Sequence, residues 1–191
     1  MRGIPISGSL RNYYFESYSL NSILVDYNYG RGNCLWILDS NSAINEDISE
    51  LDRDALPLSD LDRIILDNGK PSLISQQIFG REPEHQWCFY YQKADLARHE
   101  SDWDEILRIE HQVSDKGFSP NNKLEWLPFI EANASEGNWE RAKEITIKAF
   151  KASPITRKTF CSLWKGFESS IDGEIPEREV ILSVLKSLEC Q

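Results

Sequence analysis

Two stretches of the chain superpose without a gap, and each has the pattern of two helices joined by a tight turn. The first, residues 89–113, reads FYYQKADLARHESDWDEILRIEHQV, and the second, residues 125–149, reads EWLPFIEANASEGNWERAKEITIKA. Trp103 of the first stretch falls on Trp139 of the second, 36 positions later. Apolar residues at helical spacing flank both turns, so the repeat predicts two helical hairpins packed side by side.

The repeat has the length and residue pattern of a known helical family. A period of ~34 residues built from helix, turn and helix is typical of tetratricopeptide repeats. The second copy resembles that family at its large apolar positions, its turn, its small positions and its closing proline, which are Trp126, Phe129, Gly137-Asn138-Trp139, Ala142, Ala149 and Pro154. The resemblance implies antiparallel helix pairs that stack into a superhelix with a concave binding surface.

Some residues depart from the family pattern. Ile130 stands where the family has a small residue, and Asn133 stands where it has an aromatic one. Pro128 is harmless only if it lies in the first turn of its helix. A third pair, ITRKTFCSLWKGFESS and PEREVILSVLKSLE, matches poorly, as a terminal capping repeat does. We therefore predict a mainly α fold with six helices in three pairs from Glu84 onward, with Trp103 and Trp139 buried at equivalent places in successive pairs.

The N-terminal part has a different pattern. Residues 10–39 contain three short segments rich in Tyr, Ile, Val and Phe, with a loop signal at 30–33. They predict a three-stranded antiparallel β unit, which is too small to stand alone. The segment CLWILD is apolar on both faces, so we expect one face to pack near Trp87 and Tyr90 and the acidic stretch 40–67 to pass the other.

The acidic stretch carries much of the chain's negative charge. Between Glu46 and Asp67 there are eight acidic residues, opposed by only two arginines. We predict a solvated surface with one short helix at 60–67, capped by Ser59, and a turn at NGKP, residues 68–71. The spacing of the acids does not fit a calcium loop, because apolar residues fill the ligand positions. The stretch divides the chain into a β unit with its linker, 1–71, and a helical domain, 72–191.

Composition limits the classes of partner. The formal net charge is −10, which disfavours binding to a phosphate backbone, so no nucleic acid is expected. No apolar run approaches the ~18–20 residues of a membrane span, so this chain itself should not insert into a bilayer. The start of the chain lacks an apolar segment of signal-peptide length.

No catalytic, cofactor or metal site is predicted. The chain has no nucleophile elbow, phosphate-binding loop or dinucleotide fingerprint. His85, His99 and His111 lack metal-ligand spacing, and the last two are expected on solvated helix faces. The NAS sequon at Asn133 falls inside a predicted helix, which makes an occupied glycosylation site a poor expectation.

The four cysteines form no C-x-x-C pair and are spread over the chain, at Cys34, Cys88, Cys161 and Cys190. This excludes zinc-ribbon and thioredoxin-type spacing. Buried unpaired thiols are the expectation, and disulfides are the alternative if the domain is extracytoplasmic.

The order of segments also has a wider resemblance. Over roughly residues 10–165, and most strongly over 87–132, the chain is similar to the soluble C-terminal region of bacterial polytopic membrane proteins related to dolichyl-phosphate-mannose-type glycosyltransferases. This implies a soluble domain appended to a membrane enzyme, on its non-cytoplasmic side. The membrane-embedded acids of that family are absent from the chain, so we do not expect this chain to be the transferase.

Two functions remain open, and both are non-enzymatic. The first is a protein-interaction or assembly domain that holds a protein or peptide on the inner faces of the first helices. The second is a glycan-binding accessory domain, in which exposed aromatics of residues 13–36 stack on sugar rings. A hydrolase with an unrecognised site is a third, weaker alternative. The two leading functions differ in where aromatic side chains are exposed.

Overall fold

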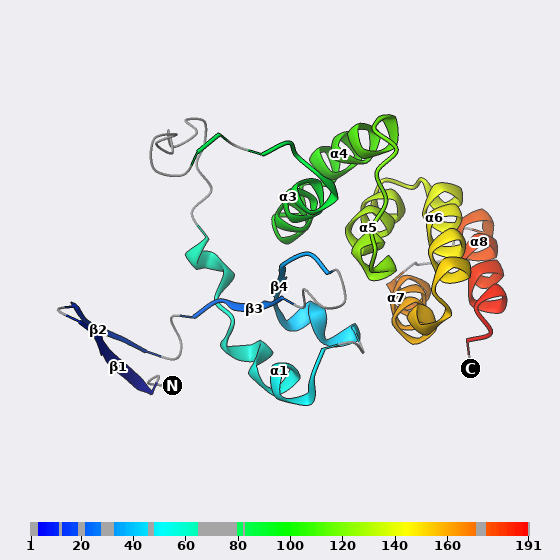
Figure 1. Ribbon diagram of the computed structural model, residues 1–191. Helices are drawn as coiled ribbons and strands as arrows, with labels where there is room; N and C mark the ends of the chain where they lie inside the picture. The colour runs from blue at the N-terminus through cyan, green and yellow to red at the C-terminus, as the bar shows by residue number, and fades with distance from the viewer. Residues whose placement is uncertain are drawn as a thin grey trace.

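The fold is mainly α, as predicted. The computed structural model describes eight segments, which are residues 4–11, 13–18, 22–27, 33–45, 48–64, 80–81, 83–170 and 175–190. Within them lie seven α-helices and four short strands. Figure 1 shows the strands and short N-terminal helices on one side and the array of longer helices on the other.

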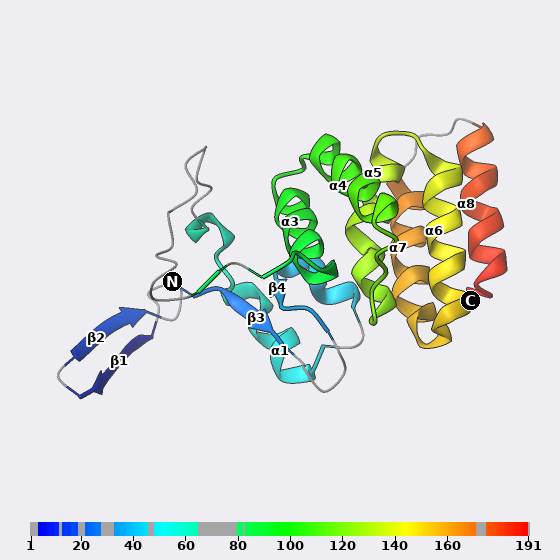
Figure 2. The same ribbon diagram turned by 45° about the horizontal axis from the view of Figure 1, so that its top comes forward.

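The longer helices form three pairs, as the repeat predicts. Their bounds are α3 (Trp87–His99), α4 (Trp103–Asp115), α5 (Leu127–Ser135), α6 (Trp139–Ala152), α7 (Arg157–Ser170) and α8 (Ile175–Ser187). Each helix packs on its partner, and α4 packs on α5, α3 on α5, and α6 on α8. The pairs therefore stack in sequence order into one array (Figure 2).

The two repeat copies have the same turn. Ser101 and Gly137, which are aligned in the sequence, both adopt positive φ, at 56° and 75°. The next backbone N–H closes each turn, from Asp102 to the Ala97 carbonyl at 2.9 Å and from Asn138 to the Asn133 carbonyl at 2.7 Å. Left-handed backbone with such a hydrogen bond is a common way to end a helix. The local repeat is thus present in the backbone.

The two aligned tryptophans are less buried than predicted. Trp103 begins α4 and Trp139 begins α6, so their places are equivalent, but both are only partly buried against the core. The first residue of a helix lies at the end of a hairpin, where fewer neighbours surround it. Trp139 packs on Trp164, which is fully buried, with 6.4 Å between the ring centroids.

The departures from the family pattern have structural reasons. Pro128 lies in the first turn of α5, where it breaks no hydrogen bond. Ile130 is fully buried. Asn133, also buried, donates its side-chain N–H to Glu110 Oε2 at 2.6 Å and to the Phe129 carbonyl at 2.8 Å. Its amide is thus used inside the helix array, which leaves the sequon without an accessible acceptor.

Glu110 connects three helices. Its second carboxylate oxygen accepts from Arg141 of α6, with 2.7 Å between Glu110 Oε1 and the nearest guanidinium nitrogen. Asn133 of α5 and Arg141 of α6 therefore meet on a carboxylate of α4. A hydrogen-bonded polar triad therefore occupies the position at which the tetratricopeptide pattern has an aromatic side chain.

The predicted three-stranded sheet is wrong. Strands β1 (Pro5–Leu10) and β2 (Tyr13–Tyr18) form one antiparallel hairpin, and β3 (Leu24–Asp26) and β4 (Trp36–Leu38) form another. The sequence from residue 10 to residue 20 was expected to be one strand, but Arg11 adopts φ 55° at the hairpin tip and reverses the chain. In both views the β1–β2 hairpin projects away from the helices (Figures 1 and 2).

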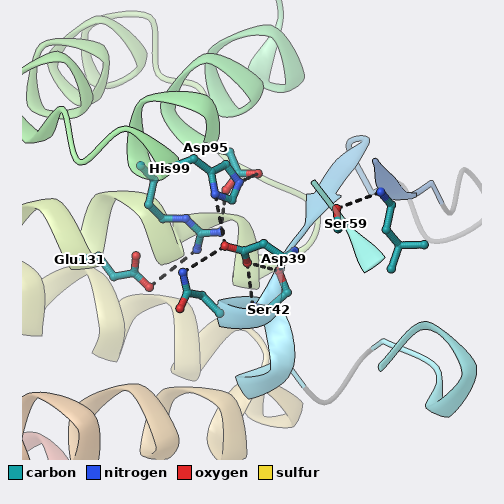
Figure 3. A network of polar contacts seen from close by, with 9 residues as sticks. Asp39, Ser42, Ser59, Asp95, His99 and Glu131 are labelled. Carbon is teal, nitrogen blue, oxygen red and sulfur yellow. Dashed lines mark hydrogen bonds and ion pairs between the residues drawn. The ribbon is translucent and has the colours of Figure 1, made fainter. Parts of the chain in front are cut away.

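The acidic stretch contains more local structure than predicted. It forms the 3-10 turns η2 (Ser40–Ile44), η3 (Leu56–Leu58) and η4 (Leu61–Arg63) and the helix α1 (Glu50–Ala55). The predicted helix at 60–67 is wrong as far as Ile64, and residues 65–71, including NGKP, lie outside the described residues. Ser59 does not cap a helix but accepts the Leu24 N–H at 3.0 Å (Figure 3).

Strand β4 connects the N-terminal region to the helices by packing against them. Trp36 and Leu38 are buried, while Ile37 is half-buried on the opposite face. The Trp36 ring lies 6.4 Å from that of Tyr91 on α3, centroid to centroid. One face of β4 thus packs on the first helix pair as predicted, although the ring contact is with Tyr91 rather than Tyr90.

The expectation of unpaired thiols is wrong. Cys34 is bonded to Cys88 and Cys161 to Cys190, and the described residues contain no free cysteine. The paired residues are 54 and 29 positions apart in the sequence. The fold brings them together, which rules based on local cysteine spacing do not detect. One disulfide joins the β4 segment to α3, and the other joins α7 to the end of the chain.

Candidate functional site

A groove of about 610 Å³ lies on the face formed by the first helices of the three pairs. The turn η2 and Leu61 form one wall of it. The helix array contributes Ser101 of the α3–α4 turn, Trp103 at the start of α4, and, from the first helices, Arg98, His99, Glu131, Ser135, Ser162, Leu163, Gly166 and Phe167. The lining combines carboxylates and hydroxyl groups with two partly buried aromatic rings, which is a composition suited to binding.

Asp39, which precedes η2, is held in a fixed orientation. Its Oδ1 accepts the Ser42 backbone N–H at 3.1 Å and the Ser42 hydroxyl at 3.0 Å, and the Asp39 N–H in turn donates to Ser42 Oγ at 3.1 Å. This is a capping box. Asn41 donates to Oδ2 at 3.0 Å. The carboxylate therefore points towards the end of α3 (Figure 3).

His99 lies between two carboxylates. Its Nδ1 is 3.4 Å from Asp39 Oδ2, and its Nε2 is 4.0 Å from Asp95 Oδ2. Asp95 and His99 are one helical turn apart, so they share a face of α3. The predicted solvent exposure of His99 is wrong, because only 6% of its side chain is exposed. His111, by contrast, is exposed as predicted.

Arg98 extends the network to the second helix pair. Its Nη2 is 2.9 Å from Asp95 Oδ1, and its Nη1 is 3.7 Å from Glu131 Oε1 on α5. The guanidinium is therefore between carboxylates of two helices, Asp95 of α3 and Glu131 of α5. Arg98 and His99 also lie in the last turn of α3, where a positive charge interacts favourably with the helix dipole.

Burial and charge shift the pKa values of this network in opposite directions. Burial acts to raise the pKa of Asp39, but the hydrogen bond and charge of His99, with help from Ser42 and Arg98, hold it well below its usual range. Burial raises the pKa of Asp95 and of Glu131 despite the opposing charge of Arg98. Although burial opposes it, the surrounding carboxylates raise the pKa of Arg98. The network holds more carboxylates than fixed cations.

The cationic groups of this network are engaged by its own carboxylates. The Nε2 atom of His99 is buried, so it has no access to a substrate in the groove. Arg98 fills the space between the carboxylates. Within the described part of the chain no group of three or more His, Cys, Asp and Glu side chains could hold a metal ion.

Sequence reasoning missed every residue of this network. Asp39 was taken as the end of a strand and His99 as part of a solvated helix face, and Asp95, Arg98 and Glu131 were not singled out. Two local signals were available. The segment DSNS has the spacing of a capping box, and Asp95, Arg98 and His99 recur at helical spacing beside the buried apolar face of α3.

Comparisons of the chain with protein-family models, with curated proteins and with solved structures find no match. Among the described residues, no helix has the length and apolar character needed to cross a bilayer.

Because the pKa of Asp39 is lowered in the folded state, the stability difference between the unmodified chain and an Asp39→Asn variant should depend on pH. An acid whose pKa is lower in the folded state stabilises the fold above its unfolded pKa, and this stabilisation is lost as the pH falls. We expect Asp39→Asn to lower the free energy of unfolding by about 1–2 kcal/mol near neutral pH, and by progressively less as the pH falls below about 4. Urea unfolding of both proteins across this range measures the difference. A difference that does not change with pH would contradict the assigned role of the carboxylate.

Proposed function

We propose that this chain is a protein-interaction domain that binds an extended segment of a partner protein in the groove on the inner faces of α3, α5 and α7. The observation that carries the proposal is the lining of that groove by the first helix of every pair. Stacked helix pairs offer such a continuous surface, and it is the surface on which repeat proteins commonly bind peptides.

The groove favours a basic segment. Asp39 and Glu131 line it, with 13% and 20% of their side chains exposed, and Asp95 lies behind them. The fixed cation Arg98 is already engaged by Asp95 and Glu131. The net charge of −10 adds a long-range attraction for a positive partner. Trp103 and Phe167 supply apolar contacts for the residues beside the basic one.

The two disulfides support an oxidising compartment. Structural disulfides are rare in the cytosol and common in extracytoplasmic domains. This agrees with the proposal that the domain is appended to the non-cytoplasmic side of a glycosyltransferase-like membrane protein and serves its assembly. The tetratricopeptide relationship is part of the same proposal, and the shared turn of the two hairpins supports it.

The second candidate is glycan binding by the β1–β2 hairpin. Tyr14 and Tyr18 are exposed and lie on the same face of β2, because they are four positions apart and side chains alternate along a strand. Aromatic rings on a flat, exposed face can stack on sugar rings. Trp36, which was expected to contribute, is buried. A glycan array probed with the chain and with a Tyr14→Ala, Tyr18→Ala variant tests this candidate.

A peptide selection tests the leading proposal. A displayed library of random peptides is selected on the immobilised full chain, and the affinity of the enriched peptides is measured by fluorescence anisotropy. We expect enriched peptides to share a Lys or Arg, and Glu131→Gln to weaken their binding about tenfold, because it removes a carboxylate from the groove.

The matched control is Glu140→Gln. It makes the same change in net charge at an exposed position of α6, outside this groove. We expect it to leave the affinity within about twofold, since a screened surface charge contributes little. Equal weakening by both variants, or enrichment of peptides without basic residues, would contradict binding in the groove.

A further inference from the structure

The disulfide between Cys34 and Cys88 lies against a buried carboxylate. Glu125 Oε2 is 3.4 Å from Cys34 Sγ, and Glu125 has no exposed surface. The Cys34 backbone N–H and the Trp36 indole N–H donate to Oε1 at 2.7 and 3.3 Å, and the Trp87 indole N–H donates to Oε2 at 2.7 Å. Three donors from two segments therefore fix the carboxyl group beside the sulfur.

The two sulfurs differ in access. Cys34 is 1% exposed, whereas Cys88 is half-buried. A reductant therefore attacks Cys88 Sγ, and Cys34 becomes the leaving group. The negative charge then develops on Cys34 Sγ beside Glu125. An ionised carboxylate repels that charge, and a protonated carboxyl group hydrogen-bonds to it and can transfer its proton.

We propose that Glu125 is the proton donor that controls the opening of the Cys34–Cys88 disulfide, so that the link between the β4 segment and α3 opens more readily, relative to a disulfide without such a carboxyl group, as the pH falls. The 3.4 Å contact supports this role. A disulfide sulfur carries no hydrogen, so Cys34 Sγ cannot donate to Glu125 Oε2 while the bond is intact. Once the bond opens, a proton can be shared between the two atoms.

The reaction balances with a dithiol as the reductant. The thiolate of the dithiol attacks Cys88 Sγ and forms a mixed disulfide. The Cys34–Cys88 bond breaks, and Cys34 Sγ takes the proton of the Glu125 carboxyl group. The second sulfur of the dithiol then displaces Cys88, which is protonated by solvent. The dithiol leaves as a cyclic disulfide and supplies both electrons.

The surroundings of Glu125 allow its carboxyl group to stay protonated at a higher pH than an ordinary glutamate does. Burial raises the pKa of Glu125, against the opposing effect of its three N–H donors and of the nearby charge of Lys123. Tyr91 of α3 is the other titratable group that acts on this region. Burial raises its pKa well above the usual value, so it stays neutral.

The second disulfide is an internal reference. Cys161 and Cys190 are both half-buried, and Arg157, Lys158 and Lys165 lie around them together with one carboxylate, Glu189, which pairs with Arg157 at 3.1 Å. These cations favour a leaving thiolate at any pH between about 5 and 8. The ratio of the two reduction rates cancels the pH dependence of the reductant itself.

The test is reduction of the full chain by dithiothreitol at several pH values. Free thiols are alkylated and assigned to each pair by mass spectrometry. We expect the rate for Cys34–Cys88, relative to Cys161–Cys190, to rise at least about tenfold from about pH 8 to about pH 5. In Glu125→Gln the ratio should not depend on pH.

A second variant guards against misfolding of the first. Trp87→Phe keeps the carboxyl group and the aromatic ring but removes one donor to the ionised form, so the midpoint of the rise should move to higher pH. A ratio that is flat in the unmodified chain would overturn the proposal. So would an unchanged profile in Glu125→Gln, or an unmoved midpoint in Trp87→Phe.

Discussion

A chain that begins at Ser72 should aggregate, or melt at least ~10 °C below the full chain. Truncation removes β4 and the acidic stretch, which together bury Trp36, Leu38, Ile48 and Leu56. It also removes the Cys34–Cys88 link. The lost apolar burial and cross-link correspond to on the order of 5 kcal/mol or more, and apolar surface of α3 becomes exposed. Calorimetry and light scattering measure both effects.

The control is a chain that lacks only residues 1–21. The hairpin residues whose burial is described are exposed, except for Gly8 and Ser17, which are half-buried, and the hairpin projects from the body. We expect this shorter deletion to leave the melting temperature within a few degrees. If the chain beginning at Ser72 melts as the full chain does, the N-terminal region is an independent appendage, and the glycan-binding candidate gains support.

Trp164→Ala should be the most damaging single substitution within the helix array. The Trp164 ring is fully buried against Trp139 and Phe167, and its indole N–H donates to Thr146 Oγ1 at 3.1 Å. We expect a loss of about 3–5 kcal/mol in the free energy of unfolding, because the substitution leaves a cavity and an unpaired hydroxyl acceptor.

Trp139→Ala is the matched comparison. Trp139 contacts the same cluster but is only partly buried, so its removal should cost roughly half as much. Chemical denaturation of the two variants measures the difference. Equal losses would mean that the aligned tryptophans are part of the core to the extent that the sequence alone predicted.

The helix array could be predicted because its signals are local. The 36-position offset between Trp103 and Trp139 reflects two hairpins with the same turn, and apolar residues at helical spacing flank both turns. Helical periodicity is imposed by burial on one face, so it is visible in a single sequence.

The groove network and the disulfides could not be predicted in the same way. Asp39 meets His99, and Cys34 meets Cys88, only because β4 and η2 pack across the first helices. Contacts between segments that are 54 or more positions apart leave no period in the sequence. Glu125 could not be predicted for the same reason. A glutamate before a helix is ordinarily solvated. Here two distant segments bury Glu125, and three of their N–H groups donate to its carboxylate.

Hydrogen exchange of the full chain with and without an enriched basic peptide tests the central claim most directly. Binding in the groove predicts slower exchange in 98–103, 131–135 and 162–167, which line it from three helix pairs. Exchange in the β1–β2 hairpin should not change. Slowing confined to the hairpin, or to the second helices α4, α6 and α8, would contradict a partner-binding groove on the inner face of the array.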